Sequence, residues 1–130
     1  MIRIEHVAVW TEDLMRLVEF YSFYFDAKAG AKYANPAKRY ESYFLSFAGG
    51  ARLELMKSST LQPAKLGLGA QRMGLTHLAI SVGSSDAVDG ITKRLLADGY
   101  DVVDGPRRTG DGYYESVVLD PDGNCIEITA

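Results

Sequence analysis

In two stretches of the chain, residues 3–10 and 74–82, the residue types alternate with a period of two, as expected for a half-buried β-strand. Each stretch carries one histidine, His6 in the first and His77 in the second. Because successive side chains of a strand point to opposite faces, each histidine shares a face with the residues two positions away. In the first stretch, the predicted face of the histidine holds Ile4, His6, Ala8 and Trp10, and the opposite face holds Glu5, Val7 and Val9. In the second stretch, the predicted face of the histidine holds Leu75, His77, Ala79 and Ser81, and the opposite face holds Leu78, Ile80 and Val82.

An amphipathic helix is predicted after each of these strands. Apolar residues at helical spacing predict the first helix over about 13–25, with an N-cap offered by Thr11-Glu12-Asp13. The second helix is predicted between an N-cap at Ser84-Ser85-Asp86 and a stop at Gly99. An aromatic cluster of the first helix is expected in the core and consists of Tyr21, Phe23, Tyr24 and Phe25.

Three strand-like runs follow each helix, which gives the order βαβββ twice. Residues 57–73 have little periodicity and are predicted to be a linker or a mobile flap. The other predicted strands lie at residues 28–33, 39–47, 51–56 and 100–104 and in two runs within 113–129, with turns at Asn35-Pro36, Gly49-Gly50 and 120–123 and a loop at 105–112.

The two halves of the chain match in residues as well as in the order of elements, which indicates duplication of a module of roughly 60 residues. We therefore predict one α+β domain over residues 1–130, whose modules form a curled mixed sheet. The first module is expected at about 1–57, a linker at 58–73 and the second module at about 74–130. The matched segments are His6-Val-Ala-Val with His77-Leu-Ala-Ile, Leu53-Glu54-Leu55 with Ile126-Glu127-Ile128, and Tyr40-Glu41-Ser42 with Tyr114-Glu115-Ser116.

Composition and charge narrow the classes of function. The chain has 130 residues, of which 47% are hydrophobic and 24% charged, as is typical of a globular protein. Its single cysteine, Cys125, excludes an internal disulfide and favours a cytoplasmic protein. Scattered basic residues and a net charge of -3 argue against a nucleic-acid partner. No apolar run approaches the ~20 residues of a membrane span, so no membrane association is expected.

The two modules together supply four candidate metal ligands. Glu54 and Glu127 each lie between two aliphatic residues of a predicted strand, and His6 and His77 are the only histidines. Because the members of each pair occupy equivalent positions in the repeat, we expect a His₂Glu₂ cluster with near two-fold symmetry inside the curled sheet. Such ligands suit Ni²⁺ or Zn²⁺ best, with Co²⁺, Fe²⁺ and Mn²⁺ as alternatives. Two positions of an octahedral shell stay open for water or substrate, as at catalytic sites.

These residues resemble the vicinal oxygen chelate superfamily, which contains glyoxalases, bleomycin-resistance proteins and dioxygenases. The resemblance covers essentially the whole chain, and its clearest motifs are GLTHLAISV at 74–82 and DPDGNCIEI at 120–128. The full set of four ligands is most similar to glyoxalase I, the lactoylglutathione lyase. The resemblance implies a homodimer whose modules pair within one chain or are swapped between two chains.

The resemblance also implies a reaction, the conversion of a 2-oxoaldehyde hemithioacetal to a 2-hydroxyacyl thioester in methylglyoxal detoxification. In glyoxalase I the metal polarises two vicinal oxygens and stabilises an enediolate. A carboxylate beside the metal carries the proton between the two carbons. By this similarity Glu127 is expected to be the base, with Glu54 as the ligand that stays in place or assists in catalysis on the other face.

Substrate contacts depart from the glyoxalase I pattern. Trp10 and Ser58 stand where that family has an arginine and an asparagine that bind glutathione. Another thiol, or another substrate with vicinal oxygens, is therefore an open alternative. The basic residue that the family places over the substrate is expected to be Arg107 or Arg108, and Tyr114 is a further candidate contact.

Other functions of the same superfamily stay open. An extradiol dioxygenase would use His6, His77 and Glu127 around Fe²⁺ and would leave Glu54 without a role. An epimerase similar to methylmalonyl-CoA epimerase would also use a metal and carboxylate bases. A bleomycin-resistance-like protein would sequester a small molecule without metal chemistry, and it would lack affinity for Ni²⁺ and Zn²⁺.

Overall fold

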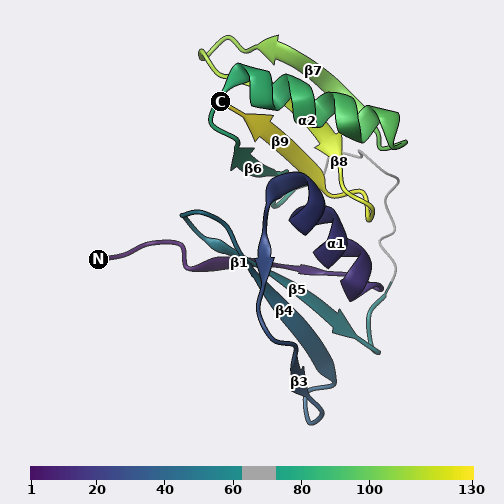
Figure 1. The fold of residues 1–130 in the computed structure, drawn as a ribbon. Coiled ribbons are helices and arrows are strands. Elements are labelled where there is room, and N and C mark those ends of the chain that lie inside the picture. The colour runs from purple at the N-terminus through teal and green to yellow at the C-terminus, as the bar shows by residue number, and fades with distance from the viewer. Residues whose placement is uncertain (63–72) are drawn as a thin grey trace. The chain divides into compact units, whose positions relative to one another are not determined.

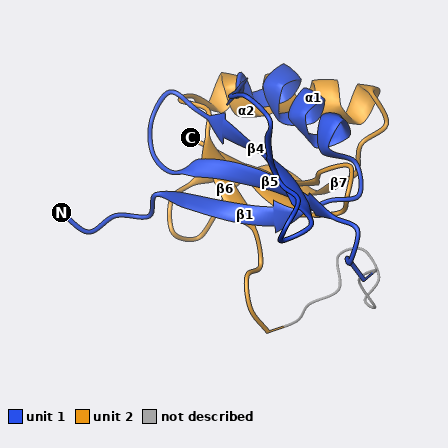
Figure 2. Ribbon diagram, turned by 90° about the horizontal axis from the view of Figure 1, so that it is seen from below, with its two compact units in different colours: residues 1–64 blue, residues 65–130 orange. Residues whose placement is uncertain are grey.

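The computed structural model of the chain describes residues 1–62 and 73–130. The chain divides into two compact units, unit 1 at Met1–Ala64 and unit 2 at Lys65–Ala130, which Figure 2 colours separately. Each unit contains one helix and its own sheet with both parallel and antiparallel strand pairs. The predicted α+β fold class is therefore confirmed.

Unit 1 places its helix against a sheet of five strands (Figure 1). The main strand order is β1-β5-β4-β2, and β3 pairs with another part of β4. β1 is parallel to β5, and β5 is antiparallel to β4. The elements are β1 (His6–Trp10), α1 (Leu14–Phe25), β2 (Lys28–Ala29), β3 (Tyr33–Asn35), β4 (Tyr40–Ser46) and β5 (Arg52–Ser58).

Unit 2 has the same plan with four strands in the order β6-β9-β8-β7. The helix α2 packs on β7, β8 and β9 (Figure 1). Here β6 is parallel to β9, as β1 is parallel to β5 in unit 1. The elements are β6 (Leu78–Ser81), α2 (Ser85–Ala97), β7 (Val102–Arg108), β8 (Tyr114–Leu119) and β9 (Cys125–Thr129).

Both helices begin at the kind of N-cap that the sequence predicts. The Asp13 side chain accepts a hydrogen bond from the Arg16 amide at 3.1 Å, and the Ser84 hydroxyl accepts one from the Ala87 amide at 3.1 Å. Each bond satisfies one amide that has no partner inside the helix. Gly99 follows α2 with φ +91, a left-handed conformation that glycine adopts at little cost.

Alternation along the strands separates an aliphatic face from a polar face in each sheet. Leu53 and Leu55 are buried in unit 1, and Ile126 and Ile128 are fully buried in unit 2. Burial of one such side chain stabilises a fold by about 1.5–3 kcal/mol, so these residues fix which face each strand turns to its helix. The glutamate between each pair of aliphatic residues must then lie on the opposite face.

A turn held by one buried carboxylate sets the start of β9. Asp120 is 4% exposed, and its Oδ1 accepts hydrogen bonds from the amides of Asp122 and Asn124, both at 2.9 Å. The Asn124 side chain donates to Asp120 Oδ2 at 2.9 Å. Gly123 has φ +85, which the tight turn requires and glycine tolerates. The predicted turn at 120–123 is confirmed.

Several predicted element boundaries are wrong. Residues 105–108 belong to β7 and not to a loop, because register irregularities let the strand pass Gly105-Pro106. β5 extends through Ser58, into the predicted linker, of which residues 63–72 lie outside the described part. The strand predicted at 74–82 begins only at Leu78. In the aromatic cluster, Phe23 is 63% exposed, because it lies on the outer side of α1.

The predicted match of Tyr40-Glu41-Ser42 with Tyr114-Glu115-Ser116 is wrong by one residue. Ser42 pairs with Met56, two positions beyond Glu54, whereas Ser116 pairs with Ile128, one position beyond Glu127. A shift of one residue turns a side chain to the other face of a sheet. Relative to the two glutamates, the structural counterpart of Ser42 is therefore Glu115.

Candidate metal centre

The first predicted ligand pair comes together within unit 1. The strands β1 and β5 run parallel with Ala8 opposite Glu54, so His6 stands two residues before the glutamate's partner on the same face. His6 Nε2 lies 3.7 Å from Glu54 Oε1. The side chains are 39% and 12% exposed, respectively, so the imidazole is open while the carboxylate is largely covered. We call this pair the first half-site.

The second predicted pair has the same arrangement within unit 2. Ala79 on β6 lies opposite Glu127 on β9, and His77 stands two residues before Ala79. His77 Nε2 lies 3.2 Å from Glu127 Oε2, and the side chains are 37% and 23% exposed. We call this pair the second half-site. The repeat thus reproduces both the ligand types and their strand register.

The four predicted ligands are described as two pairs, one in each unit. Within the described parts of the chain, no three side chains of His, Cys, Asp or Glu are grouped closely enough to hold a metal ion. Each half-site supplies one nitrogen and one oxygen donor. The complete His₂Glu₂ cluster stays a prediction.

A network of side chains holds His6 from its other side. His6 Nδ1 hydrogen-bonds the Glu5 carboxylate, and Arg52 donates to Glu5 Oε1 from Nε at 2.8 Å and from Nη2 at 2.5 Å. The Arg52 guanidinium lies 4.0 Å from the centre of the Phe44 ring, and that ring contacts His6 edge to face at 5.1 Å. The hydrogen bond to His6, reinforced by Arg52, lowers the pKa of Glu5.

The second half-site has different neighbours. The Thr76 hydroxyl lies 3.0 Å from His77 Nδ1, in the place that Glu5 takes beside His6. Val117 pairs with Glu127, as Phe44 pairs with Glu54. Cys125, two residues before Glu127, stands in the position of Arg52, and burial and the charge of Glu127 raise the pKa of its thiol.

Glu115 brings a second carboxyl group next to Glu127. The two residues lie on the same face of unit 2, because Glu115 pairs with Thr129 and Thr129 is two positions beyond Glu127. Desolvation raises the pKa of Glu115, and the charge of Glu127 and a hydrogen bond with it raise that pKa further. The carboxylate that sequence similarity assigns as the base therefore has an acidic neighbour.

The residues predicted to bind substrate near Glu127 lie on two different faces of the sheet of unit 2. Arg107 pairs with Glu115 and so lies on the face of Glu127, with its Nε 2.9 Å from Asp104 Oδ2. Arg108 pairs with Tyr114 on the opposite face. There the Tyr114 hydroxyl donates to Asp89 of α2 at 2.6 Å, and this bond raises the pKa of Tyr114. Arg107 is thus brought to the face of Glu127, whereas Arg108 and Tyr114 are not.

Trp10 and Ser58 lie on the same face as the first half-site, four residues beyond His6 on β1 and four residues beyond Glu54 on β5. Trp10 is 52% exposed and lies on the face of β1 that carries His6. Ser58 is four residues beyond Glu54 on β5, and its hydroxyl lies 2.8 Å from that of Thr60. Neither side chain supplies a positive charge beside this half-site.

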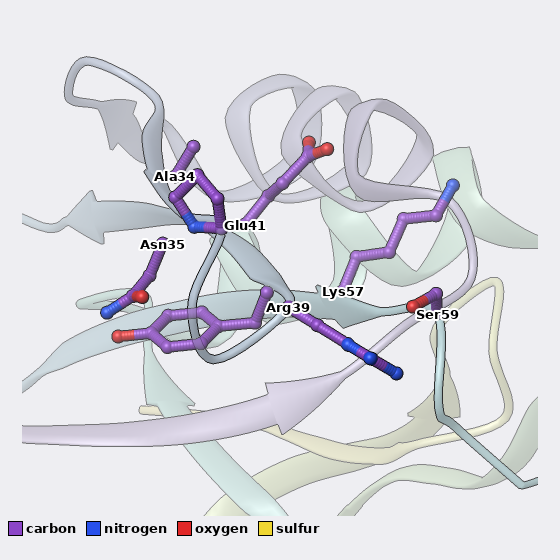
Figure 3. Close-up of a pocket in the computed structure, with 8 residues that line it drawn as sticks. Ala34, Asn35, Arg39, Glu41, Lys57 and Ser59 are labelled. Atoms are coloured by element: carbon purple, nitrogen blue, oxygen red, sulfur yellow. The ribbon is translucent and has the colours of Figure 1, made fainter.

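An open pocket of about 370 Å³ lies in unit 1 between the turn after β3 and the end of β5 (Figure 3). The cationic side chains of Arg39 and Lys57 reach it from these two elements. Tyr40 lines the pocket and also lies within the electrostatic influence of Glu54 in the first half-site. Burial and the phenol of Tyr33 raise the pKa of Tyr40, and the charge of Glu54 raises it further. None of the predicted site residues lines this pocket.

Sequence reasoning missed Glu5, Arg52, Phe44 and Glu115 as site residues. Strand alternation assigns Glu5 to the aliphatic face, but β1 begins only at His6, so the Glu5 side chain is free to turn towards Arg52. Charge complementarity between these two residues on neighbouring strands was the available signal. Glu115 was hidden by the one-residue error in the match between the modules.

One family model covers nearly the whole chain. A family model described as Glyoxalase/Bleomycin resistance protein/Dioxygenase superfamily matches residues 3–128. The chain is 40% identical over 62 residues to the uncharacterized protein YqjT of Bacillus subtilis. That stretch is 45% of this chain and spans only about half of YqjT, 48% of its length.

Solved structures share the fold over nearly the whole chain. The trypanothione-dependent glyoxalase I of Leishmania major matches with a TM-score of 0.77 and 23% identity, over 99% of this chain and 86% of that one. A possible glyoxalase from Bacillus cereus matches with a TM-score of 0.70 and 25% identity, over 100% of both chains. Among the described residues, no helix is both long and apolar enough to cross a membrane.

Proposed function

This chain belongs to the glyoxalase/bleomycin resistance protein/dioxygenase superfamily, and from that premise we propose that it is a metal-dependent lyase of the glyoxalase I type. Its reaction would convert the hemithioacetal of a 2-oxoaldehyde and a thiol to a 2-hydroxyacyl thioester. The observation that carries the proposal is the repeated half-site, in which an imidazole nitrogen faces a carboxylate oxygen at 3.7 Å in one unit and at 3.2 Å in the other.

The donors of each half-site fit a divalent transition metal. Nδ1 of both histidines is already engaged, by Glu5 and by Thr76, so Nε2 is the nitrogen left for an ion. Two atoms that bind one ion at about 2.0–2.2 Å and at right angles are about 3 Å apart, close to the 3.2 Å of the second half-site and shorter than the 3.7 Å of the first. His6, Glu54, His77 and Glu127 would hold the ion, with Ni²⁺ or Zn²⁺ as the preferred metals.

Glu127 is the residue that we assign to proton transfer. A bound ion would polarise two neighbouring oxygens of the substrate and so make the proton on the adjacent carbon more acidic. Glu127 would take that proton from one carbon and return it to the next, so the reaction is a balanced isomerisation. Glu115 can share a hydrogen bond with Glu127, and Arg107 supplies positive charge on the same face.

The thiol is proposed to differ from glutathione. Trp10 and Ser58 place no cation or amide where the resemblance implies glutathione contacts, and a tripeptide with two carboxylates needs such partners. A relative of the same fold from Leishmania major is described as trypanothione-dependent, which supports the view that the fold serves more than one thiol. In unit 1, Arg39 and Lys57 offer positive charge to an anionic part of the thiol.

We further propose that a complete site combines both half-sites, either within one domain of residues 1–130 or between two chains of a homodimer. The two arrangements use the same four ligands. Mixing His6→Ala chains with His77→Ala chains distinguishes them: a swapped dimer would regain one intact site per heterodimer, whereas pairing within a chain would leave every site incomplete.

The decisive experiment is a panel of thiols and 2-oxoaldehydes with protein loaded with Ni²⁺, Zn²⁺ or Fe²⁺. We expect thioester formation with at least one thiol, and a glutathione kcat/KM well below the ~10⁶ M⁻¹s⁻¹ of efficient enzymes. Binding of an ion without turnover of any hemithioacetal would overturn the lyase assignment. Absence of any affinity for these ions would instead favour a protein that sequesters a small molecule.

A further inference from the structure

The two half-sites differ in what holds the histidine, although the ligand pairs themselves are equivalent. Glu5 contacts Nδ1 of His6, and Thr76 contacts Nδ1 of His77. A carboxylate can only accept a hydrogen bond, so it requires a proton on Nδ1 and leaves the Nε2 lone pair free for a metal. A hydroxyl can donate or accept, so Thr76 does not select either tautomer of His77.

Glu5 is itself held in place at both its backbone and its side chain. Its carbonyl accepts a hydrogen bond from the Arg52 amide at 2.9 Å, which extends the β1–β5 pairing by one residue. The Arg52 side chain binds the Glu5 carboxylate through Nε and Nη2, and its guanidinium lies over the Phe44 ring. The corresponding positions in unit 2 hold Cys125 and Val117, which cannot form such a clamp.

We propose that Glu5 is a positioning residue for His6, clamped by Arg52, and that it makes His6 the stronger of the two imidazole ligands. A carboxylate that accepts from the remote nitrogen of a ligating histidine orients the ring and raises its basicity. The inference rests on the proposed metal site, since the benefit is a free and basic Nε2. Under this proposal His6 binds the metal ion more strongly than His77, although the two histidines occupy equivalent positions in the repeat.

The first test is the tautomer of His6 in metal-free protein. Long-range ¹H–¹⁵N NMR spectra at alkaline pH distinguish the two neutral tautomers, and a His77→Ala background leaves His6 as the only histidine. We expect His6 to carry its proton on Nδ1, and Glu5→Ala to shift it towards a mixture. An unchanged His6 tautomer in Glu5→Ala would overturn the proposal, and this result does not depend on whether the protein binds a metal.

The second test is the affinity for Zn²⁺, measured by competition with a chromogenic chelator. Glu5→Ala should weaken binding by about 10–100-fold, the range for lost outer-shell partners of metal ligands. Thr76→Ala is the matched control in unit 2 and should have a smaller effect. Glu5→Gln keeps the shape and an acceptor oxygen, so it should retain the tautomer while losing part of the affinity.

Two results would overturn the assignment of Glu5 even if the metal site is real. One is a loss of affinity in Glu5→Ala no larger than that in Thr76→Ala. The other is a persistent loss when Glu5→Ala is added to His6→Ala, because a positioning residue has no effect once its histidine is gone. If wild-type protein does not bind Zn²⁺ but His6 shows the expected tautomer, the proposed function fails and the positioning role stands.

Discussion

Ser42 and Ser116 lie on opposite faces of their sheets, although the sequence places them in matching triplets. Ser116 faces α2, and its hydroxyl lies 2.7 Å from that of Thr92, which also donates to the Val88 carbonyl at 2.6 Å. Ser42 is on the face of Glu54, fully buried, and its hydroxyl has no hydrogen-bond partner among the described residues. The two buried hydroxyls therefore differ in what they contribute to folding.

We expect Ser116→Ala to lower the free energy of unfolding by about 1–3 kcal/mol, because it leaves a buried Thr92 with one partner fewer. Ser42→Ala is the matched variant and should be neutral or slightly stabilising, because it removes an unsatisfied buried group. Urea unfolding of both variants measures the difference. Equal losses in the two variants would contradict the assignment of the faces.

Arg107 and Arg108 should respond differently to the same substitution. Arg107 lies on the face of Glu127, so Arg107→Gln should raise KM for an anionic hemithioacetal or lower kcat by about tenfold or more. Arg108 lies beside Tyr114 on the other face, 5.8 Å from its ring centre, so Arg108→Gln should leave the kinetics nearly unchanged. Steady-state kinetics of the two variants, both loaded with the same metal, measures the difference. A larger effect of Arg108→Gln than of Arg107→Gln would contradict the assignment of Arg107 to the substrate.

Loss of Glu127 should remove turnover without unfolding the protein. Glu127→Gln keeps the shape of the side chain but cannot take a proton, so we expect kcat to fall by about 10²–10⁴-fold, the usual contribution of a general base. His77→Ala removes the proposed ligand of the same half-site and should be equally severe. Circular dichroism checks the fold, and near wild-type rates in either variant would exclude the four-ligand site.

The raised pKa of Glu115 predicts a pH dependence of stability in metal-free protein. A carboxyl whose pKa is higher in the folded state stabilises the fold at acidic pH, and this contribution is lost as the pH rises through the folded pKa. Glu115→Gln should therefore be more stable than wild type at neutral pH, and the advantage should shrink towards about pH 4. Unfolding free energies across this range, measured in chelator, give the comparison. If the stability of Glu115→Gln relative to wild type increased as the pH fell, the prediction would be wrong.

Sequence patterns correctly placed each histidine on the same face of its module as its glutamate, because both positions depend on strand periodicity alone. Metal binding by these pairs stays a prediction. Aliphatic residues on either side of Glu54 and Glu127 fix the face of each glutamate, and His6 and His77 follow from the same rule. The patterns failed where periodicity stops. Glu5 precedes its strand, β7 passes through irregular pairing, and the match between the modules is one residue out of register at Glu115.

The parallel pairing of β1 with β5 and of β6 with β9 means that each half-site is contained whole within one module. One module by itself therefore encodes both predicted donor types at the spacing seen in its half-site. The two modules are therefore not interchangeable, because Glu5 and Arg52 stand behind the histidine in one module and Thr76 and Cys125 occupy these positions in the other.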